Sequence, residues 1–370
     1  MKALILYTNT GAGHASACKA ISEALQSLEV KTIEIDTLDF AGKSTSRNIE
    51  NTYVNIVKNK PDFFKFLYNA GSKISNPKIK SIIYILNTVY SNKIYEFIEE
   101  ENPDLIICTH IFCTQTISYL KNKHSLKAIT SAIITDYTCA PFWEETSLDY
   151  YFIPHKDLIN EFVSKGMDKN KLIAFGLPVC SKFRIHKNKS LSKEALNLNP
   201  NLPHILIMGG SMGAGNIYET FLALYDEFKN VQFTVICGSN SMLYKKFNDI
   251  NLNSNIHILQ FTDNIDELMD ASDILISKPG GLTSTEAMVK GLPLIMINPI
   301  PGVESANSDF FSNHKAAIAS NSIQETIESC RVIINDSKAW NDLISAQKNT
   351  INANAALDIS NFLIDKLKSR

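Results

Sequence analysis

Short apolar runs of β-forming residues alternate with longer helical stretches from one end of the chain to the other. In the second half of the chain, Gly, Pro or Asn follows each run, as at the strand ends of α/β proteins. This alternation predicts βαβ units and parallel sheets. The expected strands are residues 3–7, 105–109, 129–135, 150–153, 204–208, 232–237, 256–259, 273–277 and 293–298.

A polar, basic segment that ends at Pro203 separates two sets of strands and has no alternation of its own. We interpret residues 186–203 as a linker between an N-terminal domain, residues 1–185, and a C-terminal domain, residues 204–370. A length of 370 residues suits two domains. The expected fold class is α/β, with two Rossmann-like doubly wound domains facing each other across a cleft. The last helix is expected to be able to pack back on the N-terminal domain.

Composition and charge exclude several functional classes. The chain is 45% hydrophobic and 20% charged, which is typical of a globular protein. Its 36 basic and 38 acidic residues give a net charge of -2, which argues against nucleic-acid binding by the whole chain. The seven cysteines include no C-x-x-C pair, so we expect reduced core residues rather than disulfides or a thiolate zinc site.

No apolar run in the sequence reaches the roughly 18 residues that a membrane-spanning helix needs. The apolar start of the chain, residues 3–7, is too short for the core of a signal peptide. We therefore expect a cytoplasmic protein whose contact with a membrane, if any, is peripheral.

Glycine is concentrated in one part of the C-terminal domain: nine of the 15 glycines fall between Gly209 and Gly302. The first cluster, residues 208–215, follows a strand and precedes a helix. There, backbone N–H groups and a helix N-terminus converge on an anion, and Ser211 adds a hydroxyl donor. No lysine occupies the Walker position, so the segment is not an NTPase loop. Alone, it could also be only a tight turn.

A second glycine cluster, Pro279-Gly280-Gly281, again lies between a strand and a helix. Thr283 and Glu286, three residues apart, could form a capping box with no further role. Alternatively, Glu286 could accept two hydrogen bonds from ribose hydroxyls beside a bound phosphate. A third segment, residues 298–307, carries polar groups three residues apart that by themselves suggest only surface polarity.

Together these segments resemble two-domain glycosyltransferases of the monogalactosyldiacylglycerol synthase and processive diacylglycerol glucosyltransferase type. The resemblance covers nearly the whole chain, and its most specific part is SKPGGLTSTEAMVKGLPLIMINPIPG at residues 277–302. It also rests on residues 10–14, Thr135-Asp136, Gly176-Leu177-Pro178, residues 209–215, Gly238-Ser239-Asn240 and residues 261–264.

The resemblance implies a GT-B fold whose second domain holds a UDP-sugar. By that resemblance, Phe261 or its neighbours cradle uracil, Glu286 holds the ribose, Ser211 and Thr283 meet the diphosphate, and Glu304 with Asn307 faces the sugar. The sequence contains no D-x-D triplet, so a metal-bridged leaving group is not indicated and no cofactor is expected. The expected UDP-sugar positions are Gly209, Gly210, Ser211, Gly213, Gly238, Phe261, Thr262, Gly280, Gly281, Leu282, Thr283, Glu286, Glu304 and Asn307.

The acceptor hydroxyl must lose a proton, which calls for a base near the cleft. His14, in the loop after the first strand, and Asp136, at the end of the 129–135 strand, both qualify. We expect at least one of them to be essential, although a single histidine in a loop often has only a structural hydrogen bond.

Three positions depart from the family pattern. Cys180 stands where the family commonly has an arginine after Gly-x-Pro-Val/Ile, with Lys182 as a possible substitute. Val303 replaces a common glutamine, and Ala140 a common histidine. These departures affect the expected sugar, nucleotide and acceptor contacts.

Residues 41–95 carry nine basic and two acidic side chains, interleaved with aromatic residues. Such a region suits an anionic membrane surface, although a solvated helix face over a core stripe explains it equally well without the family. The expected acceptor and membrane contacts are Lys58, Lys60, Phe63, Phe64, Lys65, Tyr68 and Trp143.

The sequence thus predicts an inverting, metal-independent enzyme that moves a hexose from a UDP-sugar to a membrane lipid acceptor, most plausibly diacylglycerol. The expected partners are the UDP-sugar, the lipid and the inner face of the cell membrane, without nucleic acid. The alternatives are a UDP-sugar 2-epimerase, an N-acetylglucosaminyltransferase acting on another lipid-linked acceptor, and a UDP-sugar-binding protein without activity.

Overall fold

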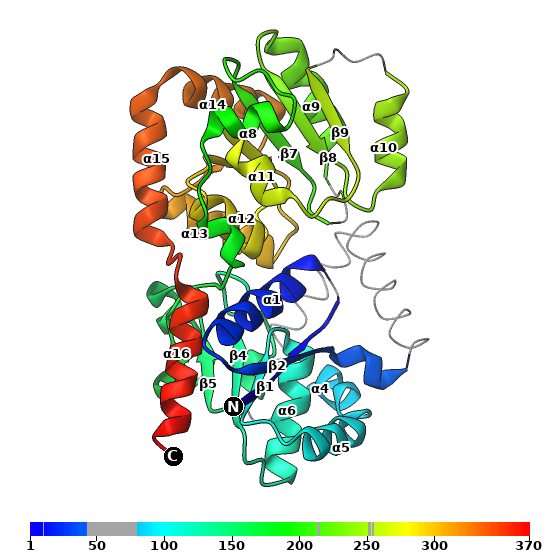
Figure 1. Cartoon of the computed structure of the whole chain (residues 1–370), viewed down its shortest axis with the longest axis vertical. Helices are drawn as coiled ribbons and strands as arrows, with labels where there is room; N and C mark the ends of the chain where they lie inside the picture. Colours follow the sequence, from blue (N-terminus) through cyan, green and yellow to red (C-terminus); the bar gives the residue numbers. More distant parts are fainter. Residues whose placement is uncertain (10, 43–79, 212, 214, 251–252, 254) are drawn as a thin grey trace. The chain divides into compact units, whose positions relative to one another are not determined.

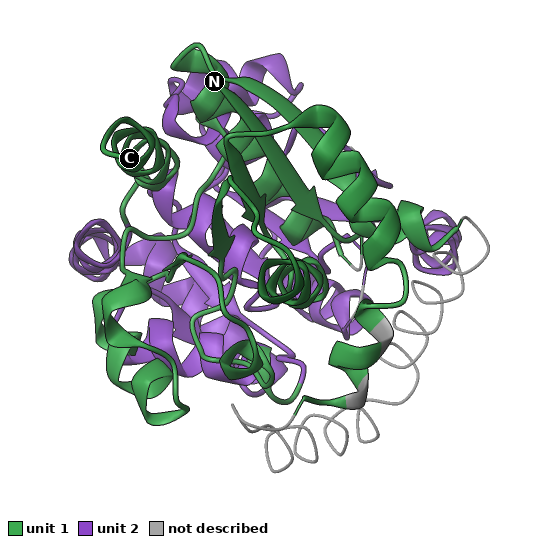
Figure 2. Ribbon diagram, turned by 90° about the horizontal axis from the view of Figure 1, so that it is seen from below, with its two compact units in different colours: residues 1–181, 301–303, 352–370 green, residues 182–300, 304–351 purple. Residues whose placement is uncertain are grey.

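A computed structural model describes residues 1–9, 11–42, 80–211, 213, 215–250, 253 and 255–370 (Figure 1). The chain forms two compact units (Figure 2). The first unit comprises residues Met1–Ser181, Pro301–Val303 and Asn352–Arg370. The second comprises Lys182–Ile300 and Glu304–Ile351. The chain therefore leaves the first unit and returns to it at its C-terminal end.

The first unit is built on a six-stranded parallel sheet of order β2-β1-β3-β4-β5-β6. Strand β2 lies on one side of β1 and all later strands lie on the other, so the chain changes direction between β1 and β3. In doubly wound sheets, ligands bind at the carboxyl ends of the strands at such a switch point. The strands are β1 (Lys2–Tyr7), β2 (Lys31–Asp36), β3 (Leu105–Cys108), β4 (Ile129–Ile133), β5 (Tyr150–Phe152) and β6 (Leu172–Ile173).

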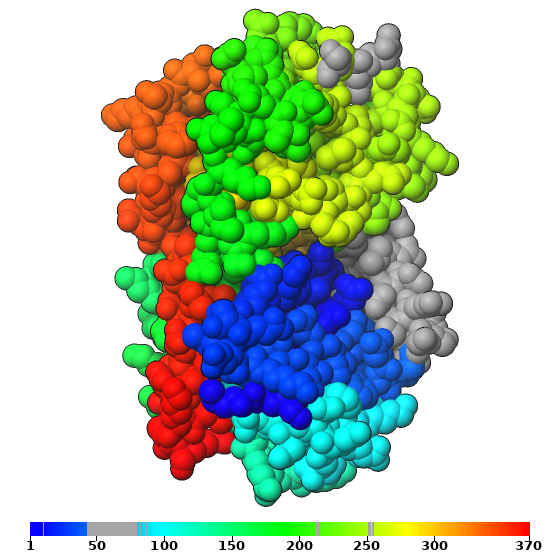
Figure 3. Space-filling view, in the orientation of Figure 1, coloured from blue at the N-terminus to red at the C-terminus, as the bar shows by residue number. Residues whose placement is uncertain are grey.

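Helix α16, at the end of the chain, completes the core of the first unit. Its buried Ile359 and Leu363 pack with Ile21 and Leu25 of α1 and with the sheet. Figures 1 and 3 show α16 alongside α1. The helices of this unit are α1 (Ala12–Ser27), η1 (Thr37–Ala41), α4 (Ile82–Asn87), α5 (Ser91–Glu101), α6 (Ile111–Lys123), η2 (Trp143–Glu145), η3 (Lys156–Leu158), α7 (Ile159–Ser164), η4 (Lys169–Lys171) and α16 (Ala355–Lys368).

The second unit contains another six-stranded parallel sheet, of order β12-β11-β10-β7-β8-β9. Its central strand β7 is buried at every position, as expected for a parallel strand covered on both faces. The switch point of this sheet lies between β7 and β10. The strands are β7 (His204–Met208), β8 (Gln232–Ile236), β9 (Ile256–Leu259), β10 (Ile274–Ser277), β11 (Leu294–Met296) and β12 (Ile318–Ala319).

The core of the second unit lies between this sheet and the buried faces of α9, α14 and α15. The doubly wound α/β class expected from the sequence is thus confirmed in both units. The helices are η5 (Ser181–Arg184), which spans the boundary between the units, and α8 (Lys189–Ala195), α9 (Ile217–Glu227), α10 (Ser241–Asn248), α11 (Ile265–Asp270), α12 (Gly281–Val289), α13 (Val303–Asn313), α14 (Ile323–Asn335) and α15 (Ser337–Thr350).

The segment that we expected to be a linker, residues 186–203, is folded into the second unit. It contains α8, whose Lys193 is 4% exposed and pairs with Asp273 at 2.8 Å. Lys189 of the same helix also pairs with Asp273, at 2.7 Å. These ion pairs fix α8 against the amino end of the sheet, so the second unit begins at Lys182 rather than at residue 204.

All seven cysteines lie in the described residues, are buried and form no disulfide, as the sequence predicts. Within the described ranges, no helix combines the length and apolar character that crossing a bilayer requires. Neither disulfides nor a spanning helix therefore contributes to the architecture of the part of the chain that the structure describes.

Candidate functional site

Both glycine clusters of the second unit lie at the switch point of its sheet. Residues 209–216 connect β7 to α9, and Lys278, Pro279 and Gly280 connect β10 to α12. Strands β7 and β10 are hydrogen-bonded neighbours in parallel register, with Met208 opposite Ser277. Their carboxyl ends therefore present the two glycine loops side by side, at the place where open α/β sheets bind ligands.

The loop after β7 packs its backbone directly against the loop after β8. A Cβ atom on Gly213, whose φ is +56°, would lie 2.1 Å from the carbonyl oxygen of Cys237. A Cβ atom on Gly238, whose φ is +57°, would lie 2.5 Å from the carbonyl oxygen of Ser211. Asn240 fixes the contact by donating its Nδ2–H to the Gly213 carbonyl at 3.0 Å. Glycine is thus required at both positions for this close approach.

The N-terminus of α12 is open. Its N-cap is Gly280, which offers no side-chain acceptor, and a Cβ atom built there would meet nothing within 4 Å. The N–H groups of the first turn, from Gly281 to Thr283, have no acceptor within the helix. Because α12 begins at Gly281, Thr283 is its third residue and does not form the capping box with Glu286 that we considered. The helix terminus instead provides donors for an anion.

Glu286, in the second turn of α12, is buried with 8% exposure. Within the described residues, its carboxylate accepts no hydrogen bond and forms no ion pair. Its pKa is raised to about 7, mainly by burial. Lys182 acts to lower this pKa, and Asp266 acts to raise it. A buried carboxylate without donors is costly unless a ligand supplies them. Two vicinal hydroxyl groups would do so.

Glu304 and Asn307, on α13, have partners within the second unit. Glu304 Oε1 pairs with Lys278 Nζ at 2.6 Å, and its Oε2 accepts the Ile300 N–H at 2.9 Å. Asn307 is fully buried and donates its Nδ2–H to the Pro279 carbonyl at 3.0 Å. Asn307 therefore supports the second glycine loop, and in this structure the Glu304 carboxylate is held by Lys278.

Phe261 and Thr262 follow β9, the edge strand on the β8 side of the sheet. The Phe261 side chain is 62% exposed, which leaves its ring available for stacking. Thr262 Oγ1 accepts the Asn264 N–H at 3.2 Å, which shapes the turn into α11. Leu282 is buried with 6% exposure, so its contribution to a ligand site is its backbone N–H.

In the first unit, His14 lies in the first turn of α1, at the switch point between β1 and β3. Its Nδ1 lies 2.8 Å from the Thr109 carbonyl oxygen and 3.2 Å from Thr135 Oγ1. Because a carbonyl can only accept, Nδ1 carries the proton and Nε2 is the acceptor nitrogen. This is the tautomer that a general base needs.

The structure brings the two predicted base candidates within electrostatic range of each other. Burial lowers the pKa of His14, while the carboxylate of Asp136 and the hydrogen bond to Thr109 act in the opposite direction. A low pKa keeps the imidazole neutral, and Asp136 favours the cation that proton uptake would form. The Asp136 carboxylate is therefore placed to favour proton uptake by His14.

The sequence analysis missed His110, which belongs to the same cluster. It caps α6 by accepting the Phe112 N–H at Nδ1, and its ring meets that of His14 edge to face, with centroids 4.4 Å apart. Burial and the charge of His14 lower the pKa of His110 well below its usual range. His110 directly follows a predicted strand, as Asp136 does, and the same strand-end argument could have identified it.

The predicted membrane contacts fall into two groups. Trp143, which we expected to contact the acceptor or the membrane, lies in η2, and its side chain is buried with 6% exposure. This burial argues against direct contact of the ring with a membrane surface. The other predicted contacts lie outside the described residues: Lys58, Lys60, Phe63, Phe64, Lys65 and Tyr68.

Cys180, one of the departures from the family pattern, and Lys182, its possible substitute, both lie in the described residues. Cys180 is buried in the first unit with 5% exposure. Lys182, which we considered as a substitute for the missing arginine, pairs with Asp266 at 2.8 Å and donates to the Asp263 carbonyl at 2.6 Å. Its ammonium group is therefore engaged by α11 and the turn before it.

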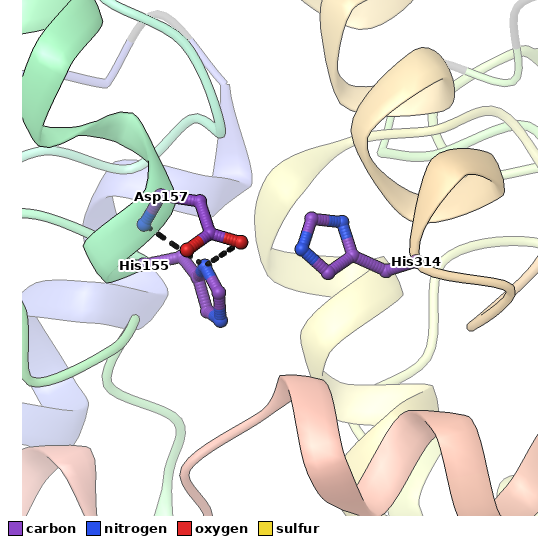
Figure 4. A group of neighbouring side chains, drawn as sticks. All are labelled: His155, Asp157 and His314. Atoms are coloured by element: carbon purple, nitrogen blue, oxygen red, sulfur yellow. Dashed lines mark hydrogen bonds and ion pairs between the residues drawn. The ribbon is translucent and has the colours of Figure 1, made fainter.

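Three residues of types that bind metals have local partners within their own units (Figure 4). His155 Nδ1 accepts the Asp157 N–H at 3.2 Å and so caps η3. His314 follows α13, donates from Nδ1 to the Phe310 carbonyl at 2.8 Å and stacks on the Phe310 ring. Both histidines thus stabilise the ends of helical segments.

Comparison with known proteins places this geometry in a family. A model described as monogalactosyldiacylglycerol (MGDG) synthase matches residues 14–179, and one described as the glycosyltransferase family 28 C-terminal domain matches residues 204–360. The chain belongs to this glycosyltransferase family. The two matches contain His14, Asp136 and both glycine loops, so the family assignment covers every part of the site described above.

A processive diacylglycerol beta-glucosyltransferase from Bacillus licheniformis is 27% identical to this glycosyltransferase over 344 residues, covering 92% of this chain and 88% of its own. The structure of MurG from Acinetobacter baumannii matches with a TM-score of 0.64 at 12% identity, covering 98% of this chain and 99% of MurG. The expected GT-B fold is thereby confirmed. A UDP-GlcNAc 2-epimerase from Neisseria meningitidis bound to UDP-GlcNAc matches with a TM-score of 0.63 at 17% identity, covering 99% of this chain and 100% of the epimerase. An epimerase therefore shares this fold.

Proposed function

We propose that this protein is an inverting glycosyltransferase that moves a hexose from a UDP-sugar to a membrane lipid, with diacylglycerol as the acceptor and without a metal on the leaving group. The observation that carries the donor half is the combination, at one switch point, of two backbone-donor loops with the buried carboxylate of Glu286. The name of the relative, processive diacylglycerol beta-glucosyltransferase, supports the acceptor half and favours glucose as the hexose.

The second unit binds the donor. The first-turn N–H groups of α12 and the dipole of that helix face the diphosphate, together with the backbone and hydroxyl of Ser211. Glu286 accepts hydrogen bonds from the ribose hydroxyls, and Phe261 lies against the uracil. As the sugar leaves, negative charge grows on the diphosphate, and these donors stabilise it; losing one such donor typically costs about 3 kcal/mol.

The first unit supplies the base. The acceptor hydroxyl oxygen attacks the anomeric carbon, the bond from that carbon to UDP breaks, and the hydroxyl proton passes to His14 Nε2. A single displacement of this kind inverts the anomeric configuration. The Thr109 carbonyl holds the imidazole in the required tautomer, and Asp136 stabilises the imidazolium that forms.

The membrane half of the proposal rests on the sequence of residues 41–95 and on the exposed side chains in the part of that region that the structure describes. Ile83, Ile85 and Val89 are 37%, 57% and 77% exposed, an unusual density of exposed aliphatic side chains. By contrast, Tyr84 and Tyr90 are buried and belong to the core. Basic residues near such a surface add about 1 kcal/mol each on anionic lipid.

One assay tests the proposal. The protein is incubated with labelled UDP-glucose, UDP-galactose or UDP-N-acetylglucosamine and with anionic vesicles that contain diacylglycerol. We expect a labelled glycolipid and one equivalent of UDP, with UDP-glucose as the best donor. An epimerised UDP-sugar in the absence of acceptor would instead identify an epimerase, and UDP binding without turnover would identify a binding protein.

A further inference from the structure

Lys278 lies between the two glycine loops of the second unit. It is the first residue after β10, and its carbonyl accepts the Gly280 N–H at 2.9 Å, so its backbone begins the second loop. Its side chain runs along the first loop, where a Cβ atom on Gly210 would lie 2.7 Å from Lys278 Cε and 3.7 Å from Nζ. The ammonium group is therefore close to the backbone of the first loop.

The ammonium group of Lys278 is held by one carboxylate. Nζ lies 2.6 Å from Glu304 Oε1, and the two side chains are only 17% and 12% exposed. Within the described residues it has no other acceptor, so two of its three N–H donors remain available. Glu304 is held on its other oxygen by the Ile300 N–H at 2.9 Å. Glu304 is thus the more firmly anchored partner, and the lysine stem can turn.

Two other lysines of the second unit are already committed. Lys182 engages Asp266 and the Asp263 carbonyl. Lys290 is buried with Asp270 at 2.7 Å, with side-chain exposures of 1% and 4%, and donates to the Ile185 carbonyl. Releasing either ammonium group would leave a carboxylate without its partner and a carbonyl unsatisfied. Lys278 is better placed than either to move its charge toward a ligand.

We propose that Lys278 binds the diphosphate of the donor, and that its transfer from Glu304 to the diphosphate releases the Glu304 carboxylate to accept hydrogen bonds from the hexose. This inference rests on the proposed function and adds a residue and a coupling to it. Diphosphate binding and hexose recognition are then linked through one ion pair.

The coupling has a direct energetic consequence. UDP alone draws Lys278 away and leaves the partly buried Glu304 carboxylate with only the Ile300 N–H. The cost of this unpaired carboxylate offsets part of the free energy gained when Lys278 binds the diphosphate. A UDP-hexose provides hydroxyl donors for the released carboxylate. We therefore expect UDP-glucose to bind more tightly than UDP, and we expect this preference to depend on Glu304.

Calorimetric titration of the full-length protein with uridine, UDP and UDP-glucose tests the inference. In Lys278→Met, which keeps the length of the stem, the affinity for UDP should fall by about tenfold to a hundredfold while that for uridine is kept. In Glu304→Gln, the affinity for UDP should rise and the preference for UDP-glucose over UDP should shrink. Lys246→Met, which removes an exposed lysine paired with Glu219, is the matched control. It should change neither the preference for UDP over uridine nor the preference for UDP-glucose over UDP.

The double variant Lys278→Met/Glu304→Gln removes both charges and guards against misfolding from an unpaired Glu304. It should lose the preference for UDP over uridine, as Lys278→Met does, whereas Lys278→Arg should keep most of it. The inference would be overturned if Lys278→Met lost affinity for uridine and for UDP equally, or if Glu304→Gln bound UDP more weakly than the wild type. Either result would leave the proposed function standing. A wild-type protein that binds neither UDP nor UDP-glucose would overturn both.

Discussion

His14 and His110 meet edge to face, with ring centroids 4.4 Å apart and ring planes at 81°. Each lies where a helix starts after a neighbouring strand, β1 for His14 and β3 for His110, so the switch point of the first sheet is lined by two imidazoles. Burial lowers the pKa of both, and a positive charge on His14 further disfavours one on His110. Burial therefore favours the neutral imidazole at both positions.

This pair determines the pH dependence that we expect for catalysis. His14 must be neutral to act as a base, so kcat/KM should fall on the acid side, with an inflection below the usual histidine pKa of about 6.5. Asp136 raises the pKa of His14. Asp136→Asn should therefore move the inflection to lower pH while activity remains at neutral pH.

The comparison with His14→Gln separates the two base candidates. Loss of the base should lower kcat by about a hundredfold or more while UDP affinity is kept. If Asp136→Asn abolishes turnover at every pH and His14→Gln does not, Asp136 is the base. Initial rates across the pH range, with UDP titrations of each variant, distinguish these results.

Glu286 predicts a pH dependence of donor binding. Its pKa of about 7 means that it is half protonated near neutral pH when the site is empty. A carboxylate accepts ribose hydroxyls better than a carboxylic acid, so UDP affinity should rise with pH and level off above the pKa, by at most about tenfold per pH unit. Glu286→Gln should bind more weakly and show a flat profile. A wild-type profile as flat as that of the variant would contradict the ribose role.

The close backbone packing of the first glycine loop predicts a stability difference between two glycines. Gly213→Ala would place a Cβ atom 2.1 Å from the Cys237 carbonyl oxygen at a positive φ. It should lower the free energy of unfolding by about 2 kcal/mol or more and weaken UDP binding. Gly280→Ala, with φ of -73° and open space around the Cβ, is the matched control. Denaturant unfolding should leave Gly280→Ala within about 1 kcal/mol of the wild type.

Lys290 and Lys187, two of the lysines that pair with α11, differ in burial and should differ in their effect on stability. Lys290→Met removes a cation whose partner, Asp270, is buried with it, and should lower the free energy of unfolding by about 3 to 5 kcal/mol. Lys187→Met removes an exposed partner of Glu267, with side-chain exposures of 49% and 42%, and should leave the free energy of unfolding close to that of the wild type. Urea unfolding of both variants measures the difference, and equal effects would show that burial does not control these pairs.

Exposed aliphatic residues of the first unit should contribute to membrane contact. Replacing Ile85 and Val89 with serine should reduce sedimentation of the protein with anionic vesicles. Replacing Lys58, Lys60 and Lys65 together should reduce this sedimentation further, and the vesicle binding that is left should depend less on salt. Val332→Ser removes a 40% exposed valine from α14 of the second unit and is the control. Sedimentation that is unchanged in both groups of variants would refute the membrane surface.

Each of the nine predicted runs overlaps a strand of the structure. Most of these strands are buried on both faces and therefore read as continuous apolar runs, and the partly buried edge strand β9 still shows alternating isoleucines. The edge strand β2, with sequence KTIEID, is partly exposed along its whole length and mixes charged with apolar residues, so its pattern is weak. The short edge strands β6 and β12, of two residues each, are too short to leave any pattern.

The sequence marked the positions of the two glycine loops, because each is a local segment that directly follows a strand. The first loop needs a close backbone approach that only glycine allows, whereas the Cβ position of Gly280 in the second loop is open. The pairing of Lys278 with Glu304 joins residues 26 positions apart and left no local signal. The start of α12 was also misjudged, because Gly280 and Gly281 read as a turn while their backbone already leads into the helix.

The return of α16 to the first unit sets an order for synthesis on the ribosome. Ile359 and Leu363 belong to the core that α1 and the first sheet share, yet they follow the second unit in the chain. Every residue of the second unit emerges before them. The second unit can therefore finish folding first, and the first unit, although most of it is made earlier, must wait for α16 to close its core.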